Sequence, residues 1–195
     1  MSAIDWVRLK KAWCAEQFSP EILPYEGELV SGHLRRLADM ERSLDVEFTS
    51  AEQKFLANIY EMESERIKYV LRAYLKLRIH KIERFVMYIL QHELLDRLSF
   101  KEREYALSYC DLLGDHLHKA FLCQLPEPLQ SLKEPGMIER PNLDRHVFIR
   151  VTAHVGDFQL DDTGLETFNL EFGDTYVMRY RAVQDLLRER RVELI

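Results

Sequence analysis

Apolar residues recur every three or four positions through the first two thirds of the chain, a spacing typical of amphipathic helices. A first helix is predicted over residues 3–17 and a second over residues 26–46. Pro20 and Pro24 fall between them and indicate a turn, because proline fixes φ and lacks an N–H donor. Each helix is expected to bury one face and to leave the other in solvent.

The third predicted helix is unusually long. Ser50 and Gln53 have the spacing of a capping box, which satisfies backbone N–H groups at a helix N-terminus. No breaker follows before about His92, so the helix would have roughly 40 residues, against a usual range of about 8–20. Such a length is typical of a coiled coil, a helical repeat or the central helix of a bundle.

A fourth helix is predicted from Ser99 to about Leu122, and Ser99 forms a second capping box with Glu102. Gly114 weakens this helix, because glycine costs about 1 kcal/mol relative to alanine inside a helix. The N-terminal part of the chain is therefore expected to be a bundle of about four helices, one of them very long.

The prolines divide the chain into two parts. Four of the six fall close together: Pro126, Pro128, Pro135 and Pro141. Such a cluster opposes both helix and central strand and reads as a linker. We predict a helical domain at residues 1–125, a linker at 126–144 and a small β-rich domain at 145–195.

After the linker, the spacing of hydrophobic residues changes to the one typical of β-strands. Strands are expected at residues 147–151, 166–170, 175–180 and 191–195, with a short helix at 183–188. A unit of this size buries only a marginal core of its own, so it is expected to dock on something else. The predicted fold class is thus mainly α, a helical bundle followed by a small β-rich domain.

Residues 66–90 of the long helix carry an unusually wide apolar surface. At 100° per residue their apolar side chains span an arc of roughly 200°, about twice what a helix covering one side of a domain needs. The excess favours burial on more than one side, against the chain's own bundle and against a second protein chain. Two cations, Arg78 and Lys81, lie within this arc.

A buried cation is costly unless it is paired, so Arg78 and Lys81 should meet carboxylates or helix C-terminal carbonyls. The candidate acids are Asp39, Glu41, Glu61 and Glu63. Alternatively, both side chains extend to solvent. We hypothesise that at least one cation lies at a subunit interface, so that Arg78→Glu breaks assembly.

Charge limits the possible partners of the chain. The formal net charge of -6 gives the whole molecule no long-range attraction to nucleic acid or to an anionic membrane. Residues 66–84 are locally basic, however, and a helical nucleic-acid-binding protein using this segment is the alternative function. A solvated face of mixed charge explains Arg72, Lys76 and His80 equally well.

Motifs for catalysis or metal binding are weak. Asp162-Thr163-Gly164 matches an aspartic-protease triplet, but it has no second copy and fits a turn. His116 and His118 are two apart on a helix, so they do not face each other as a chelating pair. No phosphate loop or nucleophile elbow is present. We expect no enzyme activity, no cofactor and no metal site.

Neither a membrane span nor a signal peptide is predicted, because the longest apolar run in the long helix, residues 85–90, is far below the roughly 20 residues that a span needs. The three cysteines are distant from one another and form no paired motif. They fit a reducing compartment.

Two stretches resemble the Sld-five type of subunit of the GINS family. They are Trp13–Pro24 and, more specifically, Met62–Phe85, within which Glu65–Leu71, Tyr74–Leu75 and Lys81–Phe85 match the family pattern. Residues 142–151, 178–180 and 192–195 are similar to the entry, penultimate strand and closing residues of the family's β domain. The resemblance spans nearly the whole chain, although residues 155–173 are too diverged to align.

The resemblance implies a two-domain architecture with the helices first, and a nuclear, non-catalytic role in DNA replication. The implied partners are three other GINS subunits, of the Psf-one, Psf-two and Psf-three types, with the MCM helicase ring and Cdc-forty-five. DNA polymerase epsilon is a further implied link, and any DNA contact is expected to be indirect or weak.

Aromatic and apolar residues in the arc and in the β-rich domain are the candidate interface. Trp13 shares a helix face with Trp6, and it either packs in the core or anchors a partner. The hypothesised interface residues are Trp13, Leu71, Tyr74, Arg78, Lys81, Phe85, Val147, Phe148, Tyr180 and Leu194.

Overall fold

The computed structural model describes residues 3–44, 50–126, 130, 132, 136–159 and 167–195. The helices are α1 (Ala3–Phe18), α2 (Gly27–Leu44), α3 (Ala51–Gln91), α4 (Phe100–Ala120) and α5 (Tyr180–Arg188), with two short 3₁₀ helices, η1 (Leu94–Arg97) and η2 (Leu122–Gln124). The strands are β1 (His146–Val151), β2 (Gly156–Gln159), β3 (Thr167–Leu170), β4 (Thr175–Arg179) and β5 (Val192–Leu194). The predicted fold class is confirmed, whereas the exact domain boundaries stay a prediction.

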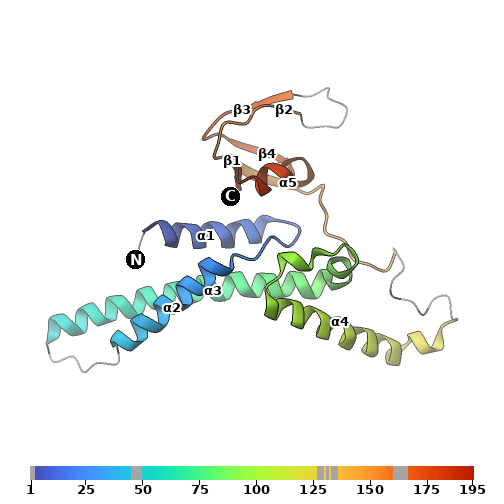
Figure 1. Ribbon diagram of the computed structural model, residues 1–195, viewed down its shortest axis with the longest axis horizontal. Helices are drawn as coiled ribbons and strands as arrows, with labels where there is room; N and C mark the ends of the chain where they lie inside the picture. Colours follow the sequence, from blue (N-terminus) through green and yellow to red (C-terminus); the bar gives the residue numbers. More distant parts are fainter. Residues whose placement is uncertain (1–2, 45–49, 127–129, 131, 133–135, 160–166) are drawn as a thin grey trace.

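Helix α3 is the axis of the helical unit (Figure 1). Its predicted capping box is present, with Gln53 N donating to Ser50 Oγ at 3.1 Å and Ser50 N donating to Gln53 Oε1 at 3.3 Å. The helix continues to Gln91 through a kink at Phe85, where φ is -113° and ψ is 20°. The sequence did not predict this kink.

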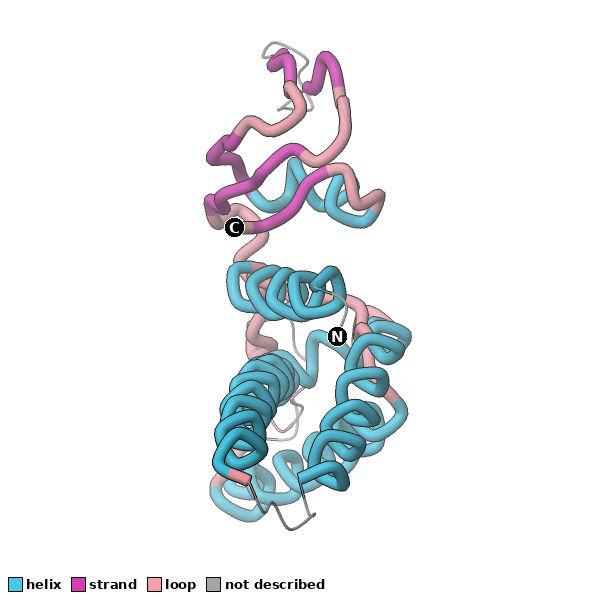
Figure 2. Tube along the Cα trace, turned by 90° about the vertical axis from the view of Figure 1, so that its left-hand side faces the viewer, coloured by secondary structure: helices cyan, strands magenta, loops and turns pink. Residues whose placement is uncertain are grey.

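Two arms extend from the centre of the helical unit (Figure 1). One arm is formed by α2 and the first half of α3, and the other by α4. Helix α1 crosses the middle of the molecule, where it contacts α3 on one side and β5 on the other. In the side view, α1 lies between the C-terminal unit and the remaining helices (Figure 2).

The wide apolar arc of α3 is covered by the chain's own helices. Its first part packs in a cluster with residues of α1 and α2: Leu9, Leu29, Val30, Leu37, Ile67, Val70, Leu71 and Tyr74. Its second part packs with the segment after α1 and with α4: Ile22, Ile82, Phe85, Val86, Ile89, Leu98 and Ala106. Burial on more than one side is as expected, and α1, α2 and α4 provide it for these residues, whereas contact with a second protein chain stays a prediction.

The C-terminal unit has its own core. Strand β1 lies between β4 and β5 in an antiparallel sheet, and its residues alternate between exposed and buried. The buried side chains of β1 pack with Val183 and Leu186 of α5. Strand β2 pairs with β3 in a separate hairpin and was not predicted, because its residues, Gly-Asp-Phe-Gln, include a single apolar side chain and show no period.

No helix within the described residues is long and apolar enough to span a membrane.

Candidate functional site

An apolar stripe lies exposed on the first half of α3. Phe55, Ile59, Met62 and Tyr69 are 65%, 46%, 70% and 65% exposed. Because these positions are four, seven and fourteen residues from the first, they share one face of the helix. We call these four residues the α3 stripe. A large apolar surface of this kind on a folded chain marks an interaction site.

Helix α1 extends the stripe into a groove. The groove has a volume of about 720 Å³ and is lined by Trp6, Asn58, Glu61, Met62, Glu65, Arg66, Tyr69 and Val70. The Arg66 guanidinium lies 5.2 Å from the centre of the Trp6 ring, and Trp13 meets Tyr69 edge-on at 6.5 Å. Aromatic rings with an adjacent arginine are the side chains enriched at energetic centres of protein interfaces.

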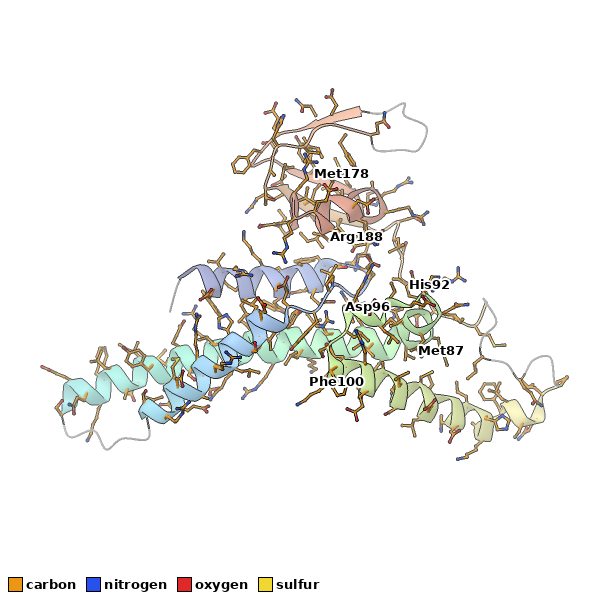
Figure 3. All side chains as sticks on the ribbon, viewed as in Figure 1. Met87, His92, Asp96, Phe100, Met178 and Arg188 are labelled. Carbon is orange, nitrogen blue, oxygen red and sulfur yellow. The ribbon has the colours of Figure 1, made fainter. Side chains whose placement is uncertain are left out.

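The second arm also exposes apolar side chains. On α4, Phe100 is 82% exposed, Leu112 67% and Leu107 48%. Figure 3 shows Phe100 where α4 begins, beside the middle of α3. Both arms therefore present surface that would be stabilised by a partner chain.

Between the arms lies a buried network of charges centred on Arg78, which has no exposed surface. Its Nε and Nη2 donate to the two carboxylate oxygens of Glu102 at 2.7 and 3.1 Å, and its Nη1 donates to Glu16 Oε2 at 3.0 Å. The remaining N–H groups donate to the carbonyl oxygens of Leu23 at 2.7 Å and Arg97 at 3.0 Å. All five guanidinium donors are thus satisfied.

Two tyrosines enclose this guanidinium. Its carbon lies 5.3 Å from the centre of the Tyr25 ring and 5.8 Å from that of Tyr74, within cation–π range. Burial raises the pKa of Tyr74 to about 12. Burial alone would lower the pKa of Arg78, but Glu102 and Glu16 reverse this, so that pKa lies above its ordinary value and the cation stays charged.

Lys81 joins the same network one turn along α3. Its Nζ donates to Glu16 Oε1 at 2.8 Å and to the carbonyl oxygens of Glu16 and Glu21 at 2.5 and 2.8 Å. Burial lowers the pKa of Lys81, and Glu16 opposes that shift. Arg78 and Lys81 therefore meet acids, as expected, but neither extends to solvent.

The acids they meet were not the ones proposed. Glu16 comes from α1 and Glu102 from the first turn of α4, which only the tertiary fold brings to α3. The four proposed acids lie elsewhere: Glu41 pairs with Lys68, Asp39 with Arg42 and Glu63 with Arg66, and Glu61 lines the groove.

The hypothesised interface residues are mostly internal. Seven are buried in the chain: Leu71, Tyr74, Arg78, Phe85, Val147, Tyr180 and Leu194. Trp13 is half-buried, Lys81 has a 12% exposed side chain, and Phe148 is 57% exposed. Arg78 presents nothing to a partner in this fold, so its role is internal, and the α3 stripe replaces it as the candidate interface.

The sequence contains one triplet that resembles a catalytic motif and one close pair of histidines. Asp162-Thr163-Gly164 lies outside the described residues. His116 and His118 are both exposed on α4. In the described ranges, no three His, Cys, Asp or Glu side chains come together as metal ligands.

Comparison with known proteins assigns the chain to a family. Residues 30–121 match the model of the GINS complex protein helical bundle domain, and residues 141–195 match that of the DNA replication complex GINS protein SLD5 C-terminus. The chain is 31% identical over 204 residues to the SLD5 protein of Arabidopsis thaliana, covering 100% of this chain and 93% of that protein. The chain belongs to the SLD5 family of GINS subunits.

Other SLD5 relatives are similar to the same extent. The Schizosaccharomyces pombe protein is 32% identical over 198 residues, covering 98% of this chain and 92% of its own. The human protein is 30% identical over 198 residues, covering 96% of this chain and 87% of the human protein. As an SLD5-family chain, the protein is a subunit of the GINS complex of DNA replication, which is a nuclear process, and other GINS subunits are its partners.

In this SLD5-family chain the sequence reasoning missed both the α3 stripe and the carboxylates around Arg78. The stripe had a readable signal, since Phe55, Ile59 and Met62 are spaced by four and three residues. These three residues lie before residue 66, and the apolar arc was counted only over residues 66–90. Glu16 and Glu102 gave no comparable signal, because they are 62 and 24 residues from Arg78.

The stability of the fold will depend on pH through Glu102. Burial acts to raise the pKa of Glu102, but hydrogen bonds from Arg78 and Ser99 and the charge of Arg78 outweigh it, so the pKa lies below 4.5. The ionised carboxylate therefore stabilises the fold above pH 4.5, and this contribution is lost as the pH falls through the lower folded-state pKa. Urea unfolding across this acidic range will show the loss.

The control for this experiment is Glu102→Gln, which keeps the shape of the side chain without a titrating group. The stability difference between the two proteins should shrink as the pH falls through the range below 4.5. A difference that stays constant over that range would contradict the role of Glu102.

Proposed function

We propose that this chain is a non-catalytic assembly subunit, which joins three other GINS subunits and helps to hold the MCM ring and Cdc-forty-five together as the replicative helicase in the nucleus. ATP hydrolysis then belongs to MCM, and DNA polymerase epsilon is a further link. Membership of the SLD5 family supports the GINS part of this proposal.

The observation that carries the assembly role is the α3 stripe. Four large apolar side chains on one helix face, each at least 46% exposed, are costly in water and are stabilised by a partner surface. The exposed side chains of α4 add a second such surface on the other arm. Two apolar arms that point in different directions suit a chain that contacts more than one neighbour (Figure 1).

Reconstitution tests the proposal. The chain is co-expressed with the other three GINS subunits of the same organism, and the product is measured by size-exclusion chromatography with light scattering. We expect one equimolar complex of four chains that retains MCM and Cdc-forty-five in a binding assay and adds no ATPase activity of its own. A chain that elutes as a separate monomer beside its co-expressed partners would overturn the assembly role.

The alternative, nucleic-acid binding by residues 66–84, is less well supported. Several cations of this segment are paired with carboxylates in the chain: Arg66, Lys68, Arg72, Arg78, Lys81 and Arg84. Among the described residues, Lys76 is the one Lys or Arg of this segment that has no carboxylate within 4.0 Å. The segment therefore keeps little unpaired positive charge. DNA affinity that falls steeply with added salt would favour this alternative.

A further inference from the structure

The two units of the chain meet at one buried carboxylate. Glu21 lies in the segment between α1 and α2 and is 4% exposed. Its Oε1 accepts hydrogen bonds from the Tyr180 hydroxyl at 2.9 Å and from Gln184 Nε2 at 2.6 Å. Its Oε2 pairs with Arg97 Nη1 at 2.8 Å. These donors come from α5 of the C-terminal unit and from η1 of the helical unit.

The surroundings of Glu21 reinforce this link. Ser19 Oγ donates to the Glu21 carbonyl at 2.7 Å and lies 3.3 Å from the Tyr180 hydroxyl. Burial and the neighbouring Glu21 carboxylate both raise the pKa of Tyr180, so its hydroxyl keeps its proton and remains a donor. The carboxylate thus receives donors from both units.

The junction is loosely packed, and Glu21 itself lines its cleft. A cleft of about 420 Å³ lies between α1, α5 and β5, and Arg188, labelled in Figure 3, lines it from the C-terminal unit. Ion pairs at its rim join Lys11 to Glu193 at 2.6 Å and Arg190 to Glu26 at 3.4 Å, with side chains 31% to 78% exposed. Exposed ion pairs of this kind contribute little to stability.

Apolar contact across the junction is limited as well. Ala15 and Phe18, near the end of α1, pack against the core of the C-terminal unit. Each unit otherwise has a separate core. Two units with separate cores and a small polar junction are expected to move relative to each other unless a specific contact fixes them.

We propose that Glu21 is the positioning residue that fixes the C-terminal unit on the helical unit. Without its charge, Arg97 loses its buried partner and the Tyr180 hydroxyl loses a strong acceptor, while each core stays intact. The C-terminal unit then samples several orientations. This inference rests on the proposed function in one respect: the position of the C-terminal unit sets the combined surface that the chain offers to other GINS subunits.

The experiment measures the distance between the units. Nitroxide labels are attached through ketone-bearing unnatural residues at Lys76 on α3 and Asp157 on β2, both exposed. This chemistry spares the native cysteines. The distance between the two labels is measured by pulsed electron–electron double resonance on the full chain and on the reconstituted complex. We expect one narrow distance distribution for the unsubstituted chain and a distribution about twofold wider, or more, for Glu21→Gln.

Glu193→Gln is the matched control, because it removes the same charge from an exposed ion pair across the same junction. Its distance distribution should be unchanged. A Glu21→Gln chain that keeps its circular dichroism spectrum and its narrow distribution would overturn the proposal.

A second variant tests the positioning role of Glu21 if Glu21→Gln fails to fold. Tyr180→Phe with Gln184→Ala removes two of the donors and leaves the Tyr180 ring in its core. Broadening in this variant supports the proposal, and an unchanged distribution contradicts it. If the unsubstituted chain does not join the other subunits, the proposed function fails, whereas the distances in the full chain still test the role of Glu21.

Discussion

Replacing Arg78 with leucine will lower the free energy of unfolding by about 3–5 kcal/mol, because it leaves the buried carboxylate of Glu102 without its cation and that of Glu16 with Lys81 alone. Glu16 and Glu102 are 1% and 8% exposed, and water cannot easily replace the five hydrogen bonds that Arg78 donates. Domains are stable by only about 5–15 kcal/mol, so this is a large part of the total. Urea unfolding followed by circular dichroism will measure it.

Arg72→Leu is the matched control for this substitution. Arg72 lies on the same helix, its side chain is 73% exposed, and its nearest carboxylate is 4.0 Å away at Glu65. Its replacement should change stability by no more than about 0.5 kcal/mol. Arg78→Lys should fall between the two, because an ammonium group cannot make the two-pronged contact with Glu102.

This prediction changes the meaning of an assembly defect at Arg78. The sequence alone suggested that Arg78→Glu breaks assembly through an interface, whereas the buried network indicates that it does so by unfolding the subunit. The two accounts differ in the isolated chain. An Arg78→Leu chain of normal stability that fails to assemble would restore the interface account.

Met62→Glu in the α3 stripe will weaken assembly with the other GINS subunits by about 2 kcal/mol or more, roughly 30-fold in affinity. Met62 is 70% exposed and lies between Ile59 and Tyr69 on one helix face, beside the groove lined by Trp6. A carboxylate placed there would put a charge into an apolar contact of the complex and would have to be desolvated. Because the side chain is exposed in the isolated chain, stability there should change by no more than about 0.5 kcal/mol.

Subunit titrations followed by light scattering or calorimetry will measure this loss. Lys54→Glu is a suitable control, since Lys54 is exposed and lies about 100° around the helix from Phe55. It adds the same negative side chain to the same arm and should leave assembly nearly unchanged. Equal losses for Met62→Glu and Lys54→Glu would point to a general charge effect and contradict a stripe-specific contact.

Local features of the fold could be read from the sequence. The capping boxes at Ser50 and Ser99 begin α3 and α4 as predicted, because their hydrogen bonds join residues three apart. The alternation in β1 likewise identified a half-buried strand. Strand β2 and the kink at Phe85 were missed, because neither has a distinct local pattern.

The candidate site was predictable only in part, for a physical reason. The sequence showed that Arg78 and Lys81 interrupt an apolar surface and need acids, but which acids lie nearby depends on how α1 and α4 cross α3. The same crossing decides which part of α3 stays uncovered. The exposed stripe is therefore a property of helix packing, and periodicity along one helix does not define it.

The carboxylate of Glu102 makes two structural contacts at once. It accepts a hydrogen bond from Ser99 N at 2.8 Å, which caps α4, and it holds the guanidinium of Arg78. On the ribosome, Glu16 and Arg78 emerge before Glu102, so the N-terminal helices cannot complete their buried network while Glu102 is still in the exit tunnel. The first three helices are then expected to remain a loosely packed intermediate until the start of α4 emerges, and to depend on chaperones during that interval.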